Sequence, residues 1–289
     1  MLKANAEKIG YGIRGVLKRF TQKKTCPSCG ASLSERVSMK LPYELRTCSN
    51  CELLYRWPYE TASEMQSFYQ KAYSQSGLTT DLPTVDQLAL LIDKKFAGSE
   101  KDFARVVQLL KALSVPKGAK VLDFGANWGY GVYQLLDAGW DTIGYEISRK
   151  RAEYARNLGV SVFTDWVDVE KLAPFDMVFS SHVLEHTPNP AEALRRQRAV
   201  LSDSGVIVAL FPSGSPCFRE KQPEIFRSMW GRVHPVMLNE AFVKNIMSDG
   251  VLAIASICDE DLRALSKWNR QSDLNGSRDN DEMLMVWCL

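Results

Sequence analysis

The sequence predicts an α/β fold with a mainly parallel sheet, helices on both faces of that sheet, and a small separate module at the N-terminus. Two observations carry this prediction. From residue 118 onward, short apolar runs alternate with amphipathic segments, a rhythm typical of parallel strands joined by helices. Before that, four of the seven cysteines lie close together. We therefore expect four segments, namely 1–24, 25–57, 58–117 and 118–289.

Each expected element follows from local pattern. Strands are expected at 119–125, 140–147, 160–165, 175–181, 206–212, 251–257 and 282–289. Helices are expected at 62–73, 101–113, 129–139, 148–159, 189–205 (with its following turn) and 238–250. Ser148 is a suitable N-cap for the helix that it precedes. The polar stretch 269–281 predicts a loop before the last strand.

Overall composition excludes few classes of protein. A chain of 289 residues with 45% hydrophobic and 24% charged residues is an ordinary globular protein. The net charge of +2 does not indicate a nucleic-acid or membrane partner. No secretory signal is recognisable and no run of about 18 apolar residues occurs. We expect a cytoplasmic protein.

Residues 1–24 form a basic amphipathic helix. They carry seven Lys or Arg against one Glu, and Ile9, Ile13, Val16, Leu17 and Phe20 follow helical spacing. Two interpretations remain open. The helix either docks its apolar stripe on its own protein or lies on an anionic membrane or partner surface.

The clustered cysteines have the spacing of a metal site. Cys26 and Cys29 form one C-x₂-C pair, and Cys48 and Cys51 form another, 18 residues further on. Two such turns bring four thiolates together in the tetrahedral arrangement that zinc prefers. A closed Cys₄ site has no open coordination position, so we expect structural Zn²⁺ and no catalysis there.

The stretch "VLDFGANWGYG" (121–131) reads as a strand that enters a glycine-rich loop. Its glycine spacing fits neither the dinucleotide fingerprint nor the P-loop. Asp123 stands at the end of the strand, where its charge would repel a phosphate. A carboxylate there suits a cofactor with a cationic amino-acid end, such as S-adenosyl-L-methionine. Glu146, after the second strand, is placed for ribose hydroxyls, and Asp165, after the third, for an adenine amino group.

Four motifs in order resemble the class I S-adenosylmethionine-dependent methyltransferases: 121–131, "GYEIS" (144–148), 175–205 and 206–212. "HVLEHTPNP" (182–190) is most like the small-molecule and sugar methyltransferase subgroup, some members of which carry an N-terminal Cys₄ module. The resemblance covers roughly residues 118–258 and, more weakly, 26–75. It implies a Rossmann-like, mainly parallel seven-stranded sheet.

The resemblance also assigns the cofactor loop, whose usual pattern is D-x-G-x-G-x-G. The matching positions here are Asp123, Gly125, Asn127 and Gly129, so asparagine replaces the middle glycine. Asparagine tolerates positive φ, so we expect the turn to survive. Its side chain would either narrow the methionine pocket or hydrogen-bond the cofactor. A loop that no longer binds cofactor, in a non-catalytic scaffold, is the alternative.

The three histidines all fall near the expected mouth of the pocket. Methyl transfer to oxygen or carbon needs a general base, and histidine suits neutral pH. His234 is the first candidate for that base and His182 the second. For His186 we expect a hydrogen bond to backbone that orients the loop, helped by Glu185.

The segment 212–234 is the expected acceptor side. It carries four basic residues and two acidic ones, and it forms either an anion-binding lid or a solvated loop. Its Phe226 and Trp230 either stack on a ring acceptor or pack the lid. The acceptor expected is a small molecule, such as a nucleotide sugar or glycan. A zinc-module protein that binds or modifies nucleic acid is the rival interpretation.

Overall fold

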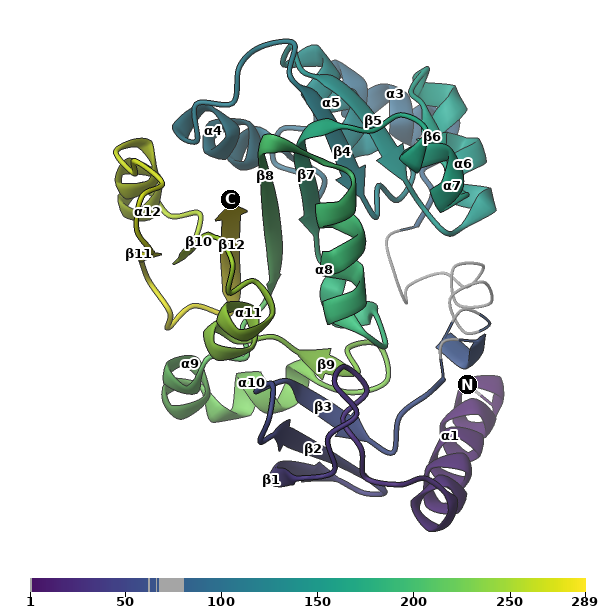
Figure 1. Ribbon diagram of the computed structural model, residues 1–289. Coiled ribbons are helices and arrows are strands. Elements are labelled where there is room, and N and C mark those ends of the chain that lie inside the picture. Colours follow the sequence, from purple (N-terminus) through teal and green to yellow (C-terminus); the bar gives the residue numbers. More distant parts are fainter. Residues whose placement is uncertain (1, 62, 66, 68–80) are drawn as a thin grey trace.

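The computed structural model describes residues 2–61, 63–65, 67 and 81–289 (Figure 1). The helix expected at 62–73 falls mostly outside these residues, apart from a short helical stretch at 63–65 and 67. None of the described helices is both long enough and apolar enough to cross a membrane.

The larger body is built on one sheet in the order β6-β5-β4-β7-β8-β12-β10-β11. Its strands are β4 (Lys120–Phe124), β5 (Asp141–Tyr145), β6 (Val162–Phe163), β7 (Phe175–Ser181), β8 (Leu201–Pro212), β10 (Val251–Ala255), β11 (Leu274–Asn275) and β12 (Glu282–Cys288). Only β12 runs antiparallel to its neighbours. The expected mainly parallel sheet of seven strands is confirmed, and the two-residue β11 adds an eighth at the edge.

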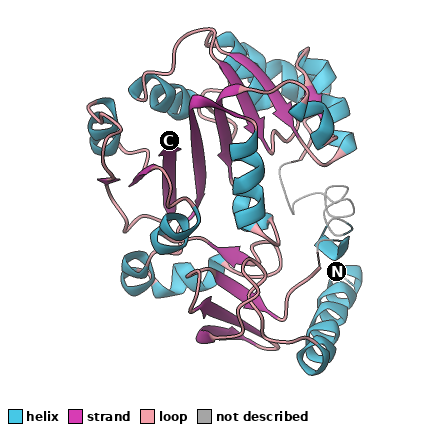
Figure 2. Cartoon of the chain, viewed as in Figure 1, coloured by secondary structure: helices cyan, strands magenta, loops and turns pink. Residues whose placement is uncertain are grey.

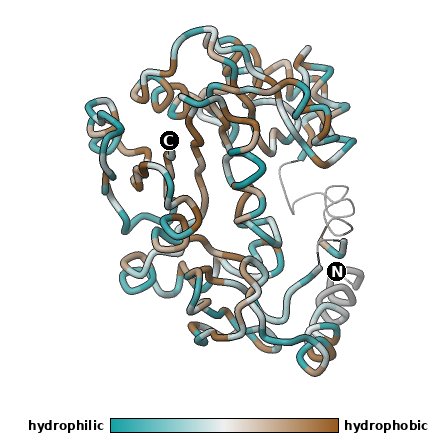
Figure 3. Tube along the Cα trace, in the orientation of Figure 1, coloured by the Kyte–Doolittle hydropathy of each residue, from teal (hydrophilic) through white to brown (hydrophobic). Residues whose placement is uncertain are grey.

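Helices cover both faces of this sheet (Figures 1 and 2). They are α3 (Val85–Asp93), α4 (Ala104–Ala112), α5 (Tyr130–Asp137), α6 (Arg149–Ala155), η1 (Arg156–Leu158), α7 (Trp166–Glu170), η2 (Leu184–His186), α8 (Pro190–Ala199), α11 (Glu240–Ile246) and α12 (Asp259–Ser266). Along β4, Val121 packs into one hydrophobic cluster and Leu122 into another. Both are fully buried, as expected for a parallel strand covered on each side. Figure 3 shows the hydrophobic trace along β8 inside more hydrophilic helices.

The chain order reverses beside β4. The strands β5 and β6 continue on one side of β4, whereas β7 and β8 continue on the other. The carboxyl ends of β4 and its neighbours therefore open onto the crevice where ligands bind in such sheets.

A second sheet joins the N-terminal segment to a strand from the C-terminal half of the chain. It contains β1 (Ser34–Lys40), β2 (Tyr43–Cys48), β3 (Leu54–Trp57) and β9 (Val236–Met237), in that order. The short helices α9 (Pro216–Lys221) and α10 (Pro223–Met229) lie beside it (Figure 1). The cysteine module of the sequence is thus completed by a strand that lies nearly 180 residues further along the chain.

Helix α1 (Leu2–Thr21) docks on this sheet through its polar and aromatic side. Tyr11 stacks on Tyr43 with ring centroids 4.6 Å apart, and Arg19 pairs with Glu44 at 2.6 Å. The opposite side is apolar and exposed, with Ile13 56%, Val16 46%, Leu17 61% and Phe20 85% accessible. Of the two interpretations of the apolar stripe, docking on the protein itself is wrong for these four side chains; the Ile9 side chain lies outside the described residues. Arg19, Lys18 and other polar groups hold the helix instead.

Candidate functional site

Asp123 lies at the carboxyl end of β4, buried beneath the start of α5. The glycine at position 131 makes room for it, because a Cβ there would come within 2.7 Å of Asp123 Oδ2. Glu146 follows the end of β5, the strand that pairs directly with β4. The sheet therefore brings the two carboxylates that the sequence singled out to adjacent strand ends.

The glycine loop turns through three left-handed residues. Gly125 has φ of +91°, Asn127 +54° and Gly129 +83°. Asparagine thus adopts the positive φ that the pattern requires, as expected from the sequence. Its Oδ1 accepts a hydrogen bond from the Trp128 backbone N–H at 2.9 Å and another from the Arg151 guanidinium. The Asn127 side chain is held by its own turn and by α6.

Glu146 ties the loop to β5. Its Oε1 accepts from the Ser148 N–H at 2.7 Å, and its Oε2 accepts from the Asn127 N–H at 3.0 Å. Ser148 stands at the expected N-cap of α6, but its side chain makes no capping hydrogen bond. The turn at this helix start is stabilised by the carboxylate instead.

Burial gives both acids unusual proton affinity. Burial, reinforced by the neighbouring Glu146, raises the pKa of Asp123 to about 7. Burial also raises the pKa of Glu146 to about 7, against the hydrogen bonds from Ser148 and Asn127. A cation placed beside them would favour their charged forms.

Asp165 follows β6 as the N-cap of α7, where its side chain accepts from the Val167 N–H at 3.0 Å. It is exposed, unlike the other two acids. The three acids thus stand at the carboxyl ends of β4, β5 and β6, with Asp165 at the rim.

The histidines gather around Glu185, a fully buried carboxylate in η2. His186 lies next to it, and its Nδ1 is 2.8 Å from the Val233 carbonyl oxygen. This confirms the expected backbone hydrogen bond of His186. The ring of His234 packs on that of His186, with centroids 4.8 Å apart.

The two candidate bases differ in charge. Burial lowers the pKa of His234, and the neighbouring His186 adds to this effect. His182 Nε2 lies 2.7 Å from Glu282 Oε1 and its Nδ1 lies 3.3 Å from Glu185 Oε1. Although burial opposes its charge, these two carboxylates raise the pKa of His182 to about 10. At neutral pH, His182 is therefore charged and His234 neutral.

The histidine cluster adjoins the glycine loop. A Cβ at Gly125 would meet the Val183 side chain at 2.3 Å, so the two loops are in direct contact. Val183 stands between His182 and the buried Glu185 in sequence. The acids on β4 and β5 and the histidine cluster are therefore two halves of one region.

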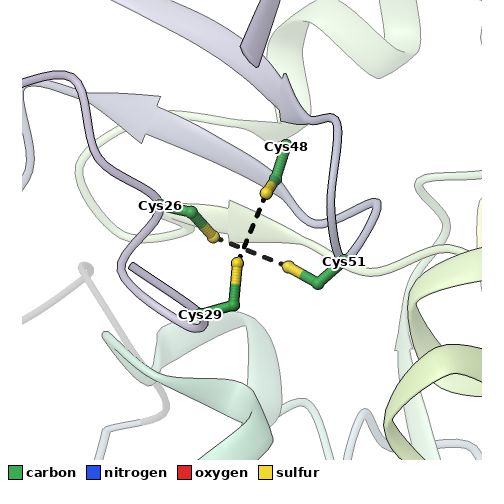
Figure 4. Close-up of side chains that lie close together, drawn as sticks. All are labelled: Cys26, Cys29, Cys48 and Cys51. Atoms are coloured by element: carbon green, nitrogen blue, oxygen red, sulfur yellow. Dashed lines mark hydrogen bonds between the residues drawn. The ribbon is translucent and has the colours of Figure 1, made fainter. Parts of the chain in front are cut away.

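The four cysteines converge on one point from two turns (Figure 4). Cys26 Sγ lies 3.6 Å from Cys51 Sγ, and Cys29 Sγ lies 3.5 Å from Cys48 Sγ. Sulfurs placed tetrahedrally at ~2.3 Å from zinc would be about 3.8 Å apart, so the donor set fits this ion. Cys26, Cys48 and Cys51 are buried and Cys29 is exposed.

Part of the segment 212–234, expected from the sequence to face an acceptor, packs on the N-terminal sheet. Phe226 and Trp230 are buried in one cluster with Tyr43 and Leu45. These two aromatic residues pack within the protein, which is one of the two roles expected for them. Among the basic residues, Lys221 pairs with Asp279 at 2.7 Å and the Arg219 guanidinium lies over the Phe226 ring.

Two contacts of the site were missed by sequence reasoning. Arg151, on α6, donates to the Asn127 side chain and is buried. Glu282, at the start of β12, contacts a histidine 100 residues away. Neither residue belongs to a motif, so only the tertiary fold reveals them.

A family model described as "Methyltransferase domain" matches residues 99–249, which is more than half of the 289 residues. The chain belongs to this methyltransferase-domain family.

Two curated methyltransferases are similar over part of their length. An uncharacterized methyltransferase of Oceanobacillus iheyensis is 30% identical over 120 residues, covering 39% of this chain and 56% of the relative. The ubiquinone biosynthesis O-methyltransferase of Bordetella avium is 32% identical over 98 residues, covering 31% of this chain and 41% of the relative. The chain spans about half the length of the curated relatives that it matches.

The fold also resembles solved methyltransferases. The plantazolicin methyltransferase BpumL, in complex with a pentazolic analog and SAH, superposes with a TM-score of 0.50 at 13% identity. The match covers 78% of this chain and 96% of that one. At this identity, the likeness concerns the fold alone.

The raised pKa of Asp123 predicts a pH-dependent cost to stability. Its ordinary pKa is 3.8, so between that pH and about 7 the folded chain retains a proton that the unfolded chain releases. Stability contributed by this group therefore falls as the pH rises through that window. Asp123→Asn removes the cost. We expect its stability relative to the parent to increase by about 1–3 kcal/mol from about pH 5 to about pH 8.

Urea unfolding of the ligand-free protein at both pH values measures this difference. Asp141→Asn is the matched control, because Asp141 is an exposed aspartate at the other end of the neighbouring strand β5. A stability difference for Asp123→Asn that stays constant with pH would contradict the assigned cost.

Proposed function

We propose that the chain transfers a methyl group from S-adenosylmethionine to a small acceptor, either sugar-containing or anionic. The observation that carries this is the pair of buried carboxylates, Asp123 and Glu146, at the reversal point of a methyltransferase-family sheet. A sulfonium cofactor also carries an ammonium group, and such positive charge offsets the cost of burying two acids. A phosphate ligand would add to that cost.

Each expected cofactor residue takes a part in this proposal. Asp123 attracts the cationic amino-acid end, and Gly125, Asn127 and Gly129 shape the loop that encloses it. Glu146 accepts hydrogen bonds from ribose hydroxyls through the lone pairs that its two backbone contacts leave. Asp165, at the exposed rim, accepts from the adenine amino group.

The proposal predicts cofactor binding that depends on Asp123. Isothermal titration with S-adenosylmethionine and S-adenosylhomocysteine should show one site per chain. Asp123→Ala should weaken that binding by at least about 100-fold, since truncating a buried charge partner costs ~3 kcal/mol or more. Asp141→Ala should leave it unchanged. If the parent protein binds neither compound, the chain is not a methyltransferase.

We propose His234 as the proton acceptor when the nucleophile carries a proton. A neutral ring at pH 7 can take up a proton, whereas His182 already holds one between two carboxylates. Because His182, the second candidate for the base, already holds its proton, we propose that it instead fixes positive charge beside Glu185. In-line transfer further requires that acceptor and methyl group be aligned, which the adjoining segment 212–234 would provide.

This assignment predicts that cofactor binding and turnover separate in His234→Ala. The variant should bind S-adenosylmethionine normally but lose about 10²–10⁴-fold in turnover, the usual contribution of a general base. The acceptor is first found by mass spectrometry, as the member of a panel of nucleotide sugars, phosphorylated sugars and small acids that gains one methyl group. Unchanged turnover in His234→Ala would rule out the base assignment.

The cysteine cluster is proposed to hold one structural zinc ion. The support is the chemistry and spacing of the donor set, four thiolates at tetrahedral separations. Because the site would be closed, it has no place in the transfer reaction.

We propose that the exposed face of α1 contacts an anionic membrane surface. Ile13, Leu17 and Phe20 point away from the protein, and Arg14 and Lys23 are exposed in the same helix and just after it. A helix mounted with its apolar side outward and cations alongside fits an interface between acidic headgroups and acyl chains.

Vesicle cosedimentation tests this surface. The chain should bind vesicles that contain phosphatidylserine and not pure phosphatidylcholine, and Leu17→Ser with Phe20→Ser should abolish binding. Val85→Ser is the control, since Val85 is a highly exposed apolar residue on α3, outside this face. Absence of binding by the parent protein refutes the proposal. A monomer–dimer shift in the double variant would instead assign the face to a second copy of the chain.

A further inference from the structure

All three histidines of the chain surround one buried carboxylate, and we infer that Glu185, His186 and His234 form a second metal site. The ion would be a single divalent transition ion, bound by two imidazole nitrogens and one carboxylate oxygen. This site shares no residue with the cysteine cluster, uses different donor atoms and has three protein ligands instead of four.

The buried Glu185 carboxylate is incompletely satisfied and could accept a bound cation. Its side chain has no accessible surface. Among the described residues the His182 ring contacts Oε1, whereas Oε2 has no hydrogen-bond partner. The nearest nitrogens are His182 Nδ1 at 3.3 Å and His186 Nε2 at 3.8 Å, and both lie on the side of Oε1. A buried carboxylate oxygen without a hydrogen bond is costly, and a bound cation would satisfy it directly.

In both His186 and His234 the backbone contact is made by Nδ1, which leaves Nε2 as the nitrogen that could bind a metal ion. His186 Nδ1 lies 2.8 Å from the Val233 carbonyl oxygen, and His234 Nδ1 lies 2.8 Å from the Met229 carbonyl oxygen. A carbonyl can only accept, so each Nδ1 carries a proton, and in the neutral form of either ring the lone pair is on Nε2. Metal-binding histidines are commonly fixed in this way, with the other ring nitrogen donating to a backbone carbonyl.

The donor atoms are close enough for one ion. One ligand atom from each of the three residues lies within 4.8 Å of the others. Ligands at ~2.1 Å from a common ion are about 3–3.5 Å apart, so binding needs the donor atoms to close by at most about 1–2 Å. Two imidazoles and one carboxylate suit zinc, manganese or iron more than magnesium or calcium.

Three protein ligands leave coordination positions open, unlike the four thiolates. The site adjoins the glycine loop through the contact of Val183 with Gly125. The open positions would therefore take an acceptor that offers two neighbouring oxygens, such as a vicinal diol or a hydroxy acid. The ion would occupy the His234 lone pair, so ion binding and the base role of His234 exclude each other. With the ion bound, the pKa of an ion-bound acceptor hydroxyl would be lowered and its proton would pass to solvent water.

Manganese binding tests the site without cofactor or acceptor, so its failure is distinct from a failure of methyl transfer. The zinc-loaded protein, with its thiolates already occupied, is titrated with Mn²⁺ and followed by electron paramagnetic resonance. One Mn²⁺ should bind per chain and be displaced by one further equivalent of Zn²⁺, which binds such sites more tightly.

The decisive variant is His234→Asn. Its amide can still donate to the Met229 carbonyl, as Nδ1 does, but it has no group in the place of Nε2. Mn²⁺ binding should weaken by at least about tenfold while the melting temperature stays near that of the parent. His186→Asn likewise keeps a donor for the Val233 carbonyl and removes Nε2, and Glu185→Gln removes the carboxylate charge. Both variants should also weaken Mn²⁺ binding. His182→Ala should retain the ion, since its ring already lies between two carboxylates.

The inference is overturned if the parent protein binds no Mn²⁺ at this site, or if folded His234→Asn and His186→Asn bind it as the parent does.

Discussion

Strand β9 pairs with β3 through Leu54 opposite Met237 and Tyr55 opposite Val236, and the Arg56 N–H donates to the Pro235 carbonyl at 2.7 Å. His234 is the residue directly before this pairing begins. The N-terminal sheet therefore fixes the backbone that carries His234 and sets it against His186 and Glu185 in the other sheet's η2. Without this pairing, no strand would hold His234 beside His186 and Glu185, which lie much earlier in the chain.

The cysteine cluster supports the same β3–β9 pairing, so a structural metal there would also help to position His234. Cys48 closes β2 and Cys51 precedes β3, so a metal at this point would hold the two strands that β9 extends. Asn239, just after β9, donates to the Glu52 carbonyl in the second knuckle at 3.0 Å. The proposed zinc would thus stabilise the backbone around His234 through one continuous sheet.

Local sequence pattern is sufficient to predict the strands of the large sheet and the positions of its three acidic residues. Strands buried on both faces are short continuous apolar runs with readable carboxyl ends, so the sequence alone assigns Asp123, Glu146 and Asp165 to those ends. Asn127 can also be placed in the glycine loop from the sequence, because asparagine is one of the few residues other than glycine that tolerate positive φ. Its φ is +54°. What could not be predicted depends on contacts between distant segments. The β3–β9 pairing spans about 180 residues, the Glu282–His182 contact spans 100, and α1 buries the side that hydropathy marks as polar.

Hydrogen–deuterium exchange before and after zinc removal tests this dependence most directly. If a metal on the four cysteines supports the β3–β9 pairing, stripping it with a thiol-selective chelator should speed exchange across residues 43–57 and across 229–237 together. Residues 119–124 of β4 should keep their protection, because they belong to the other sheet. Unchanged protection of 229–237 after complete zinc removal would show that His234 is positioned independently of the cysteine module, and would contradict this account.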